Sequence, residues 1–308
     1  MPAGDRPIVT LTTDFGTRDH YVAAMKAVLL RYCPDVCLID VTHEVPRHDI
    51  LCGSITLERA VDGFPPETVH LAVVDPGVGT NRRILIAQIN QQRVVCPDNG
   101  LITWAWRRLG HIAPSPGTPG EGWGEGLNSV NQSDSHLENP HPNPLPEYRA
   151  RGKSPPIQHL LESTRVYELK WRPRSSSHTF HGRDVMAPAA GMIAMGAPLE
   201  KIAEPIDDPI LLDVYPASPG STTARIIHID VFGNATTNMD RSTLQSPDER
   251  TFAVKGRHLG RLHRTYWDAP PGEALALVGS SGLLEIAVRD GSAADQLDLH
   301  VGDIVTIE

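Results

Sequence analysis

The chain has 308 residues, of which 40% are hydrophobic and 21% charged, and its 37 acidic and 28 basic residues give a formal net charge of −9. This length suits two domains, and the acidic balance disfavours nucleic acid or an anionic membrane as the main partner. No apolar run approaches the ~20 residues of a membrane span, and no signal peptide is visible, so we expect a cytoplasmic protein.

The first part of the chain alternates strand-like and helix-like segments. Short apolar runs predict strands at 8–12, 36–41 and 69–74. Helical spacing predicts one helix that begins after Asp19 as its N-cap and ends at Cys33-Pro34, and a second helix over 49–61. This order predicts a parallel α/β sheet. Further elements are expected as strands at 84–89 and 93–96 and as helices at 101–109 and 184–195.

One segment differs in composition from the rest. Residues 111–160 contain nine of the 27 prolines and six of the 26 glycines, but only seven Leu, Ile, Val or Phe residues. Such a segment buries too little apolar surface to offset its chain entropy. We therefore expect a disordered surface insertion over about 114–156.

After about residue 205 the pattern changes to short strands separated by turns. The expected strands are 224–230, 251–255, 274–278, 283–288 and 303–307. This spacing is typical of a small all-β barrel or sandwich. We expect an α/β domain over 1–200 and a smaller β-barrel domain over 205–308.

Candidate chemistry lies at the ends of the first strands. Asp14, Asp40 and Asp75 each follow an apolar run, and ligands bind outside the carboxyl ends of parallel strands. These acids suit substrate hydroxyls or a cation, although each could instead cap a helix or turn. The glycine-rich segment 74–80 matches neither a dinucleotide-binding motif nor a P-loop, and it favours close approach of backbone to a ligand.

Further candidates stand in three short polar segments. His181 precedes a predicted helix in Thr179-Phe-His-Gly-Arg-Asp184 and is either an acid–base group or a structural histidine. Phe232 can stack on a base and Asn234 can bond a base edge, although Gly233-Asn234 is also a common hairpin turn. The third segment is Gly279-Ser-Ser-Gly282.

These segments, in this order, resemble the S-adenosyl-L-methionine (SAM) hydrolases, also called SAM hydroxide adenosyltransferases, which are related to the fluorinases and chlorinases. The resemblance covers nearly the whole chain outside 114–156. It implies an N-terminal α/β domain, a C-terminal β-barrel, and a trimer that binds SAM between neighbouring subunits. The matching motifs are TDFGTRDHYVAAMKAVL, DVTHEVPRHDI, VHLAVVDPGVGTNRR, PDNGLITW, TFHGRDVMAPAA, HIDVFGNATTN and GSSGLLEIAVRDGSAA.

The resemblance also implies roles for individual residues in substrate binding. Seven residues are concerned: Asp14 on the ribose diol, Asp19 and Asp230 on the methionine ammonium, Phe180 beside the ribose, Phe232 and Asn234 on adenine, and Ser281 on the methionine carboxylate. His48 departs from the family, where a large aromatic residue is usual near the methionine end.

The same resemblance implies a catalytic set of Asp75, Arg82 and His181. Fluorinases have tyrosine at the position of Asp75 and serine at that of Gly182, and a carboxylate repels halide but accepts a proton from water. We therefore expect hydrolysis of SAM to adenosine and methionine, with no cofactor. The rival functions are a SAM-dependent halogenase and a non-catalytic SAM- or adenosine-binding protein. A metal site built from Asp14, Asp75 and His181 is a further alternative.

Overall fold

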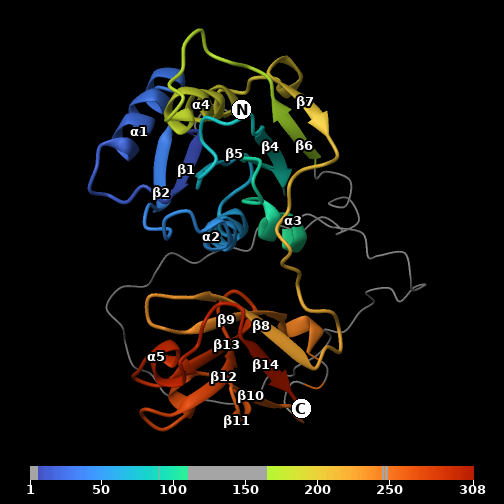
Figure 1. Cartoon of the computed structure of the whole chain (residues 1–308). Helices are drawn as coiled ribbons and strands as arrows, with labels where there is room; N and C mark the ends of the chain where they lie inside the picture. Colours follow the sequence, from blue (N-terminus) through green and yellow to red (C-terminus); the bar gives the residue numbers. More distant parts are fainter. Residues whose placement is uncertain (1–5, 90, 110–164, 245, 247–248) are drawn as a thin grey trace, which may run out of the picture.

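An open sheet with helices on both faces is followed along the chain by a closed barrel (Figure 1). The structure is a computed structural model that describes residues 6–89, 91–109, 165–244, 246 and 249–308. The insertion predicted at 114–156 lies outside these residues. The predicted fold class, an α/β domain plus a β-barrel, is confirmed.

The N-terminal sheet has seven strands in the order β2-β1-β3-β5-β4-β6-β7. The first four strands of this order are parallel, and the last three join by antiparallel pairing. The prediction of a parallel sheet is therefore wrong at this edge. Only residues 90 and 91 separate β4 from β5, and so short a connection permits antiparallel pairing alone. The strands are β1 (Ile8–Thr13), β2 (Cys37–Thr42), β3 (Val69–Val73), β4 (Ile84–Ile89), β5 (Gln92–Pro97), β6 (Arg165–Leu169) and β7 (Ala203–Ile206).

Helices cover both faces of this sheet because its central strands are apolar on both sides. Leu71 and Val73 of β3 join the core beneath α1 (Tyr21–Tyr32) and α4 (Ala187–Ala194). Ala72 joins the core beneath α2 (Ile50–Gly63) and α3 (Thr103–Leu109). In Figure 1, α2 and α3 lie between the sheet and the barrel.

The helix starts differ in detail from the predictions. Asp49 caps α2, as expected, by accepting the backbone N–H of Cys52 at 2.9 Å. Asp19 is not the cap of α1: the N-cap is His20, whose side chain makes no capping bond. The helix predicted over 184–195 is instead a π-helical turn (Gly182–Met186) that leads into α4. Pro188 stands in the first turn of α4, where its missing N–H costs nothing.

The C-terminal strands close into a barrel in the order β10-β11-β12-β13-β9-β8-β14. All five predicted strands are present, and β9, β11 and the helix α5 were not predicted. Alternate side chains of β8 and β14, such as Ile226 and Val305, fill the barrel core. The elements are β8 (Thr223–Ile229), β9 (Ala235–Asp240), β10 (Thr251–Val254), β11 (Arg257–His263), β12 (Ala274–Val278), β13 (Leu283–Val288), α5 (Ala293–Leu297) and β14 (Ile304–Ile307), with 3-10 turns at Leu199–Lys201, Arg241–Thr243 and Tyr266–Asp268.

The sheet and the barrel share a small apolar junction. Ile55 of α2 and Trp104 of α3 pack with Ile227 of β8 and Leu283 of β13, and all four side chains are buried. This junction places α2 beside the barrel. Across the part of the chain that the structure describes, no helix combines the length and apolarity that a membrane crossing demands.

Candidate active site

A cavity of about 420 Å³ opens beside the carboxyl ends of β1 and β3 and the entrance of the π-helical turn. Asp75 and His181 line it, together with an aromatic wall that includes Phe180. This is the edge of the sheet where parallel strands place ligands. Two of the three predicted catalytic residues therefore meet at one cavity.

Arg82 joins these two residues. Its Nε donates to Asp75 Oδ1 at 2.6 Å, and its Nη2 donates to Asp75 Oδ2. The same Nη2 lies 3.3 Å from His181 Nδ1. The Arg82 and Asp75 side chains are only 8% and 5% exposed, so this forked ion pair is shielded from water and held in one geometry.

The surroundings of His181 favour its neutral form. Burial, and next the positive charge of Arg82, lower the pKa of His181 below its usual 6.5. A guanidinium group only donates hydrogen bonds, so Nδ1 of His181 accepts from Arg82. The proton of the neutral ring is then on Nε2, which makes that nitrogen a donor.

Three aromatic rings form one wall of this cavity. Phe180 is 8% exposed and makes edge contacts with Phe15 and Tyr21, at centroid distances of 5.8 and 5.3 Å. The Arg183 guanidinium lies 4.8 Å from the centroid of the Phe180 ring. One wall of the cavity is therefore built of packed aromatic rings and is largely apolar.

The other candidates of the N-terminal domain, Asp14, Asp19 and Asp40, do not line this cavity. Asp14 directly follows β1, and its Oδ2 accepts the backbone N–H of His48 at 2.9 Å. Asp19 is exposed before α1. Asp40 lies within β2 rather than after it, and its ion pair with Lys26 at 2.6 Å gives it a structural role.

In the C-terminal domain, a tight turn between β8 and β9 contains three candidates. Asp230 Oδ1 accepts the backbone N–H groups of Phe232 and Asn234, both at 2.9 Å, and its Oδ2 lies 3.2 Å from the Asn234 amide nitrogen. Gly233 has a φ of +80°, and a Cβ there would be 2.1 Å from Ser292 Oγ. These hydrogen bonds and the close approach at Gly233 fix the backbone conformation of the turn. Phe232 within it is 73% exposed.

A second cavity, of about 300 Å³, lies between α2 and the barrel. It is lined by two predicted residues, Asp230 and Ser281, and by three that sequence reasoning missed, Glu58, Tyr266 and Glu285. The Tyr266 hydroxyl donates to Glu285 Oε1 at 2.6 Å, and burial raises the pKa of Glu285. A charged residue inside the apolar run 283–288 was the signal that could have found Glu285.

The structure therefore separates the predicted site residues into two groups. Asp75, Arg82, Phe180 and His181 are together at the first cavity, whereas Asp230 and Ser281 line the second. Within the described ranges, no three His, Cys, Asp or Glu side chains are placed to hold a metal ion. The alternative of a metal site on Asp14, Asp75 and His181 thus gains no support.

Comparison with known proteins places the chain in a family. The profile of the SAM hydroxide adenosyltransferase N-terminal domain matches residues 9–115 and 154–203, and that of the C-terminal domain matches 224–306. A Salinispora tropica protein named (R)-S-adenosyl-L-methionine hydrolase is 34% identical over 96% of both chains. A fluorinase from an Actinoplanes species is 27% identical over 80% of this chain and 76% of its own. The crystal structure of an uncharacterized conserved protein from Thermotoga maritima superposes with a TM-score of 0.74 at 28% identity, covering 98% of this chain and 100% of that one. The chain belongs to the SAM hydroxide adenosyltransferase family.

Proposed function

We propose that this protein hydrolyses SAM to adenosine and L-methionine, by attack of an activated water on the 5′ carbon of the ribose. The observation that carries the proposal is the Asp75–Arg82–His181 set, with its shielded ion pair, at the rim of an aromatic-walled cavity. The hydrolase relatives and the family assignment support the same substrate.

Hydrolysis of SAM requires the protein mainly to control one water molecule. The sulfonium makes methionine a good leaving group, so the enzyme needs to position one water, accept its proton and exclude the bulk solvent. The Arg82 guanidinium orients the Asp75 carboxylate. Neutral His181 presents Nε2–H as a donor, which suits holding the oxygen of the attacking water. This arrangement favours Asp75 over His181 as the proton acceptor.

The same cavity disfavours a halide nucleophile. Asp75 brings a negative charge to it, which repels an anion. Gly182 supplies no hydroxyl, and a Cβ at that position would lie 3.2 Å from Val73 Cγ1 and 3.5 Å from Met25 Sδ. A serine there would therefore require the neighbouring core to move.

We further propose that the active form is a homotrimer in which the first cavity of one subunit meets the barrel of the next. The separation of the two groups of candidate residues supports this arrangement, because one SAM molecule needs both its ribose and its adenine held. The exposed Val231 and Phe232 side chains, at 95% and 73%, are available to reach a neighbouring subunit. The four free thiols suit a reducing compartment such as the cytoplasm.

Two measurements test these proposals. Purified protein is incubated with SAM, with and without chloride or fluoride, and the products are separated by chromatography. Adenosine and methionine in equal amounts support hydrolysis, a halogenated nucleoside indicates a halogenase, and tight binding without products indicates a binding protein. Light scattering across a dilution series, read together with activity, tests the trimer: a monomer that keeps full activity would refute it.

A further inference from the structure

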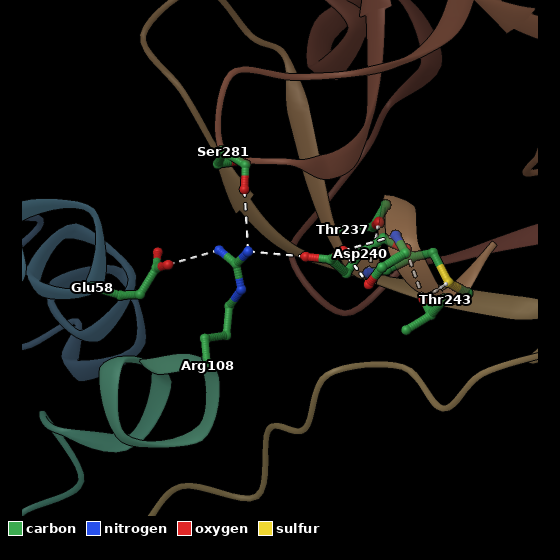
Figure 2. Close-up of polar contacts among 8 residues, drawn as sticks. Glu58, Arg108, Thr237, Asp240, Thr243 and Ser281 are labelled. Carbon is green, nitrogen blue, oxygen red and sulfur yellow. Dashed lines mark hydrogen bonds and ion pairs between the residues drawn. The ribbon is translucent and has the colours of Figure 1, made fainter. Parts of the chain in front are cut away.

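One arginine connects both domains (Figure 2). Two of its partners, Glu58 and Ser281, line the second cavity. Arg108 of α3 donates from Nη1 to Glu58 Oε1 of α2 at 2.7 Å. Its Nη2 donates to Asp240 Oδ2 at 3.0 Å and to the backbone carbonyl of Ser281 at 3.2 Å. The Glu58 side chain is only 3% exposed and that of Arg108 17%, so water weakens this ion pair little.

These contacts determine the position of the loop that holds Ser281. The loop is a tight turn in which Gly279 N–H bonds to Leu283 O at 2.9 Å and Gly282 N–H to Gly279 O at 3.0 Å. The backbone carbonyl of Ser281, which belongs to this loop, accepts a hydrogen bond from Arg108 of α3. Asp240, the second barrel partner of Arg108, also caps the neighbouring 3-10 turn through the backbone N–H of Ser242. Arg108 thus fixes two adjacent barrel loops against α2 and α3.

The cavity beside this loop is strongly charged. Its lining includes the carboxylates of Glu58, Asp62, Asp230 and Glu285 and the guanidinium of Arg59. A ligand group that carries both an ammonium and a carboxylate needs acidic partners for the first and a well-placed donor for the second. Ser281 lines this cavity together with Asp230. A small displacement of the loop would therefore move Ser281, the donor for the ligand carboxylate, relative to Asp230.

We propose that Arg108 is a positioning residue: it holds the 279–282 loop so that Ser281 receives the carboxylate of the amino-acid end of the substrate. The proposal rests on the proposed function, because it takes SAM as the ligand. It assigns Arg108 no contact with SAM. Its consequence is selective, since loss of Arg108 impairs recognition of the carboxylate but leaves the water-activating set at the other cavity unchanged.

The test compares SAM with decarboxylated SAM, which lacks only that carboxylate. For Arg108→Ala we expect KM for SAM to rise about ten-fold, the scale of one charge-assisted hydrogen bond, with kcat within about two-fold of the parent. The dissociation constant of decarboxylated SAM, measured by calorimetry, should change less than about two-fold. Arg108→Lys keeps one charged donor and should restore part of the affinity for SAM.

Arg107→Ala is the matched control. Arg107 stands on the same helix, donates to the Val214 carbonyl and lies 3.5 Å from the centroid of the Tyr215 ring. It therefore also fixes α3 to the segment that leads into the barrel, without contacting the Ser281 loop. Its loss should lower the unfolding temperature, as that of Arg108 does, but leave the ratio of the two affinities unchanged.

The possible outcomes distinguish a failure of the positioning role of Arg108 from a failure of the proposed SAM hydrolysis. Equal weakening of both ligands by Arg108→Ala, or no weakening of either, overturns the positioning role even if the parent hydrolyses SAM. A parent that neither binds nor hydrolyses SAM overturns both. If Arg108→Ala does not fold, Asp240→Asn, which removes one anchor of the same guanidinium, should show the same selectivity for SAM on a smaller scale. Equal effects of that variant on both ligands would also refute the proposal.

Discussion

Replacing Asp75 by asparagine tests water activation most directly. Both Asp75 oxygens accept from Arg82 in a pair whose side chains are less than 10% exposed. Asparagine keeps one acceptor, but its amide group opposes an Arg82 donor, and it cannot take a proton from water. Loss of a positioned general base slows a reaction by ~10²–10⁴-fold, or about 3–5 kcal/mol of activation free energy. The free energy of unfolding should fall by about 3 kcal/mol, at the lower end of the cost of breaking a buried ion pair.

The assay is single-turnover release of adenosine, with SAM affinity measured in parallel by calorimetry. SAM binding should persist, because the ribose, adenine and methionine contacts are assigned to other residues. Asp98→Asn is the control, since Asp98 is 1% exposed and pairs with Arg83 at 2.7 Å, but does not line either cavity. Asp98→Asn should lower the free energy of unfolding by about as much as Asp75→Asn does, without slowing hydrolysis. Hydrolysis by Asp75→Asn at the parent rate, or equal slowing by Asp98→Asn, would refute the assignment.

Three other outcomes are expected. Arg82→Ala and His181→Ala should each slow single-turnover hydrolysis, and the double changes with Asp75→Asn should be non-additive because the three residues act as a unit; additive losses would contradict a shared role. Deletion of 114–156 should leave a folded, active protein, since the family profile matches on both sides of the segment and loop closure costs only ~0.6 kcal/mol per doubling of length; an insoluble or inactive product would disprove it. Burial lowers the pKa of His70 from 6.5 to about 4, so the unfolded state takes up this proton first, and stability should fall by about 3 kcal/mol as the pH drops from 6.5 towards 4. For His70→Gln, the free energy of unfolding should depend less steeply on pH over this range. An unchanged pH dependence would contradict the role of His70.

Local pattern predicted much of the fold, for physical reasons that can be named. The run that became β3 is buried along its whole length and contributes to the cores on both faces of the sheet, because helices cover both sides. Such a run is visible in sequence. The strand β9, Ala-Thr-Thr-Asn-Met-Asp, has no such run. It forms because β8 and β13 pair with it on either side, and its Thr237 hydroxyl bonds to the Leu284 carbonyl at 2.9 Å. Pairing of this kind depends on tertiary context.

For the candidate site too, contacts that depend on tertiary packing could not be predicted from sequence. Family resemblance selected Asp75, Arg82 and His181, and the structure brings them into contact although His181 stands 99 residues from Arg82. The contact between Arg108 and Ser281, 173 residues apart, was not predicted, because an arginine in the last turn of a short helix has many possible partners. Only the packing of α3 against the barrel selects one.

The turn between β8 and β9 has a consequence for the energetics of association. Asp230 accepts from two backbone groups and lies within bonding distance of one side-chain amide of its own loop, so the chain there is ordered before any ligand or neighbour arrives. Each rotamer-rich side chain or flexible segment that must be frozen on binding costs roughly 0.5–1.5 kcal/mol. A loop that is already ordered avoids most of this entropy loss. In the proposed trimer, its exposed Phe232 would meet the neighbouring subunit in a backbone conformation that is already set. Association at this loop should therefore be limited by collision and orientation rather than by loop ordering.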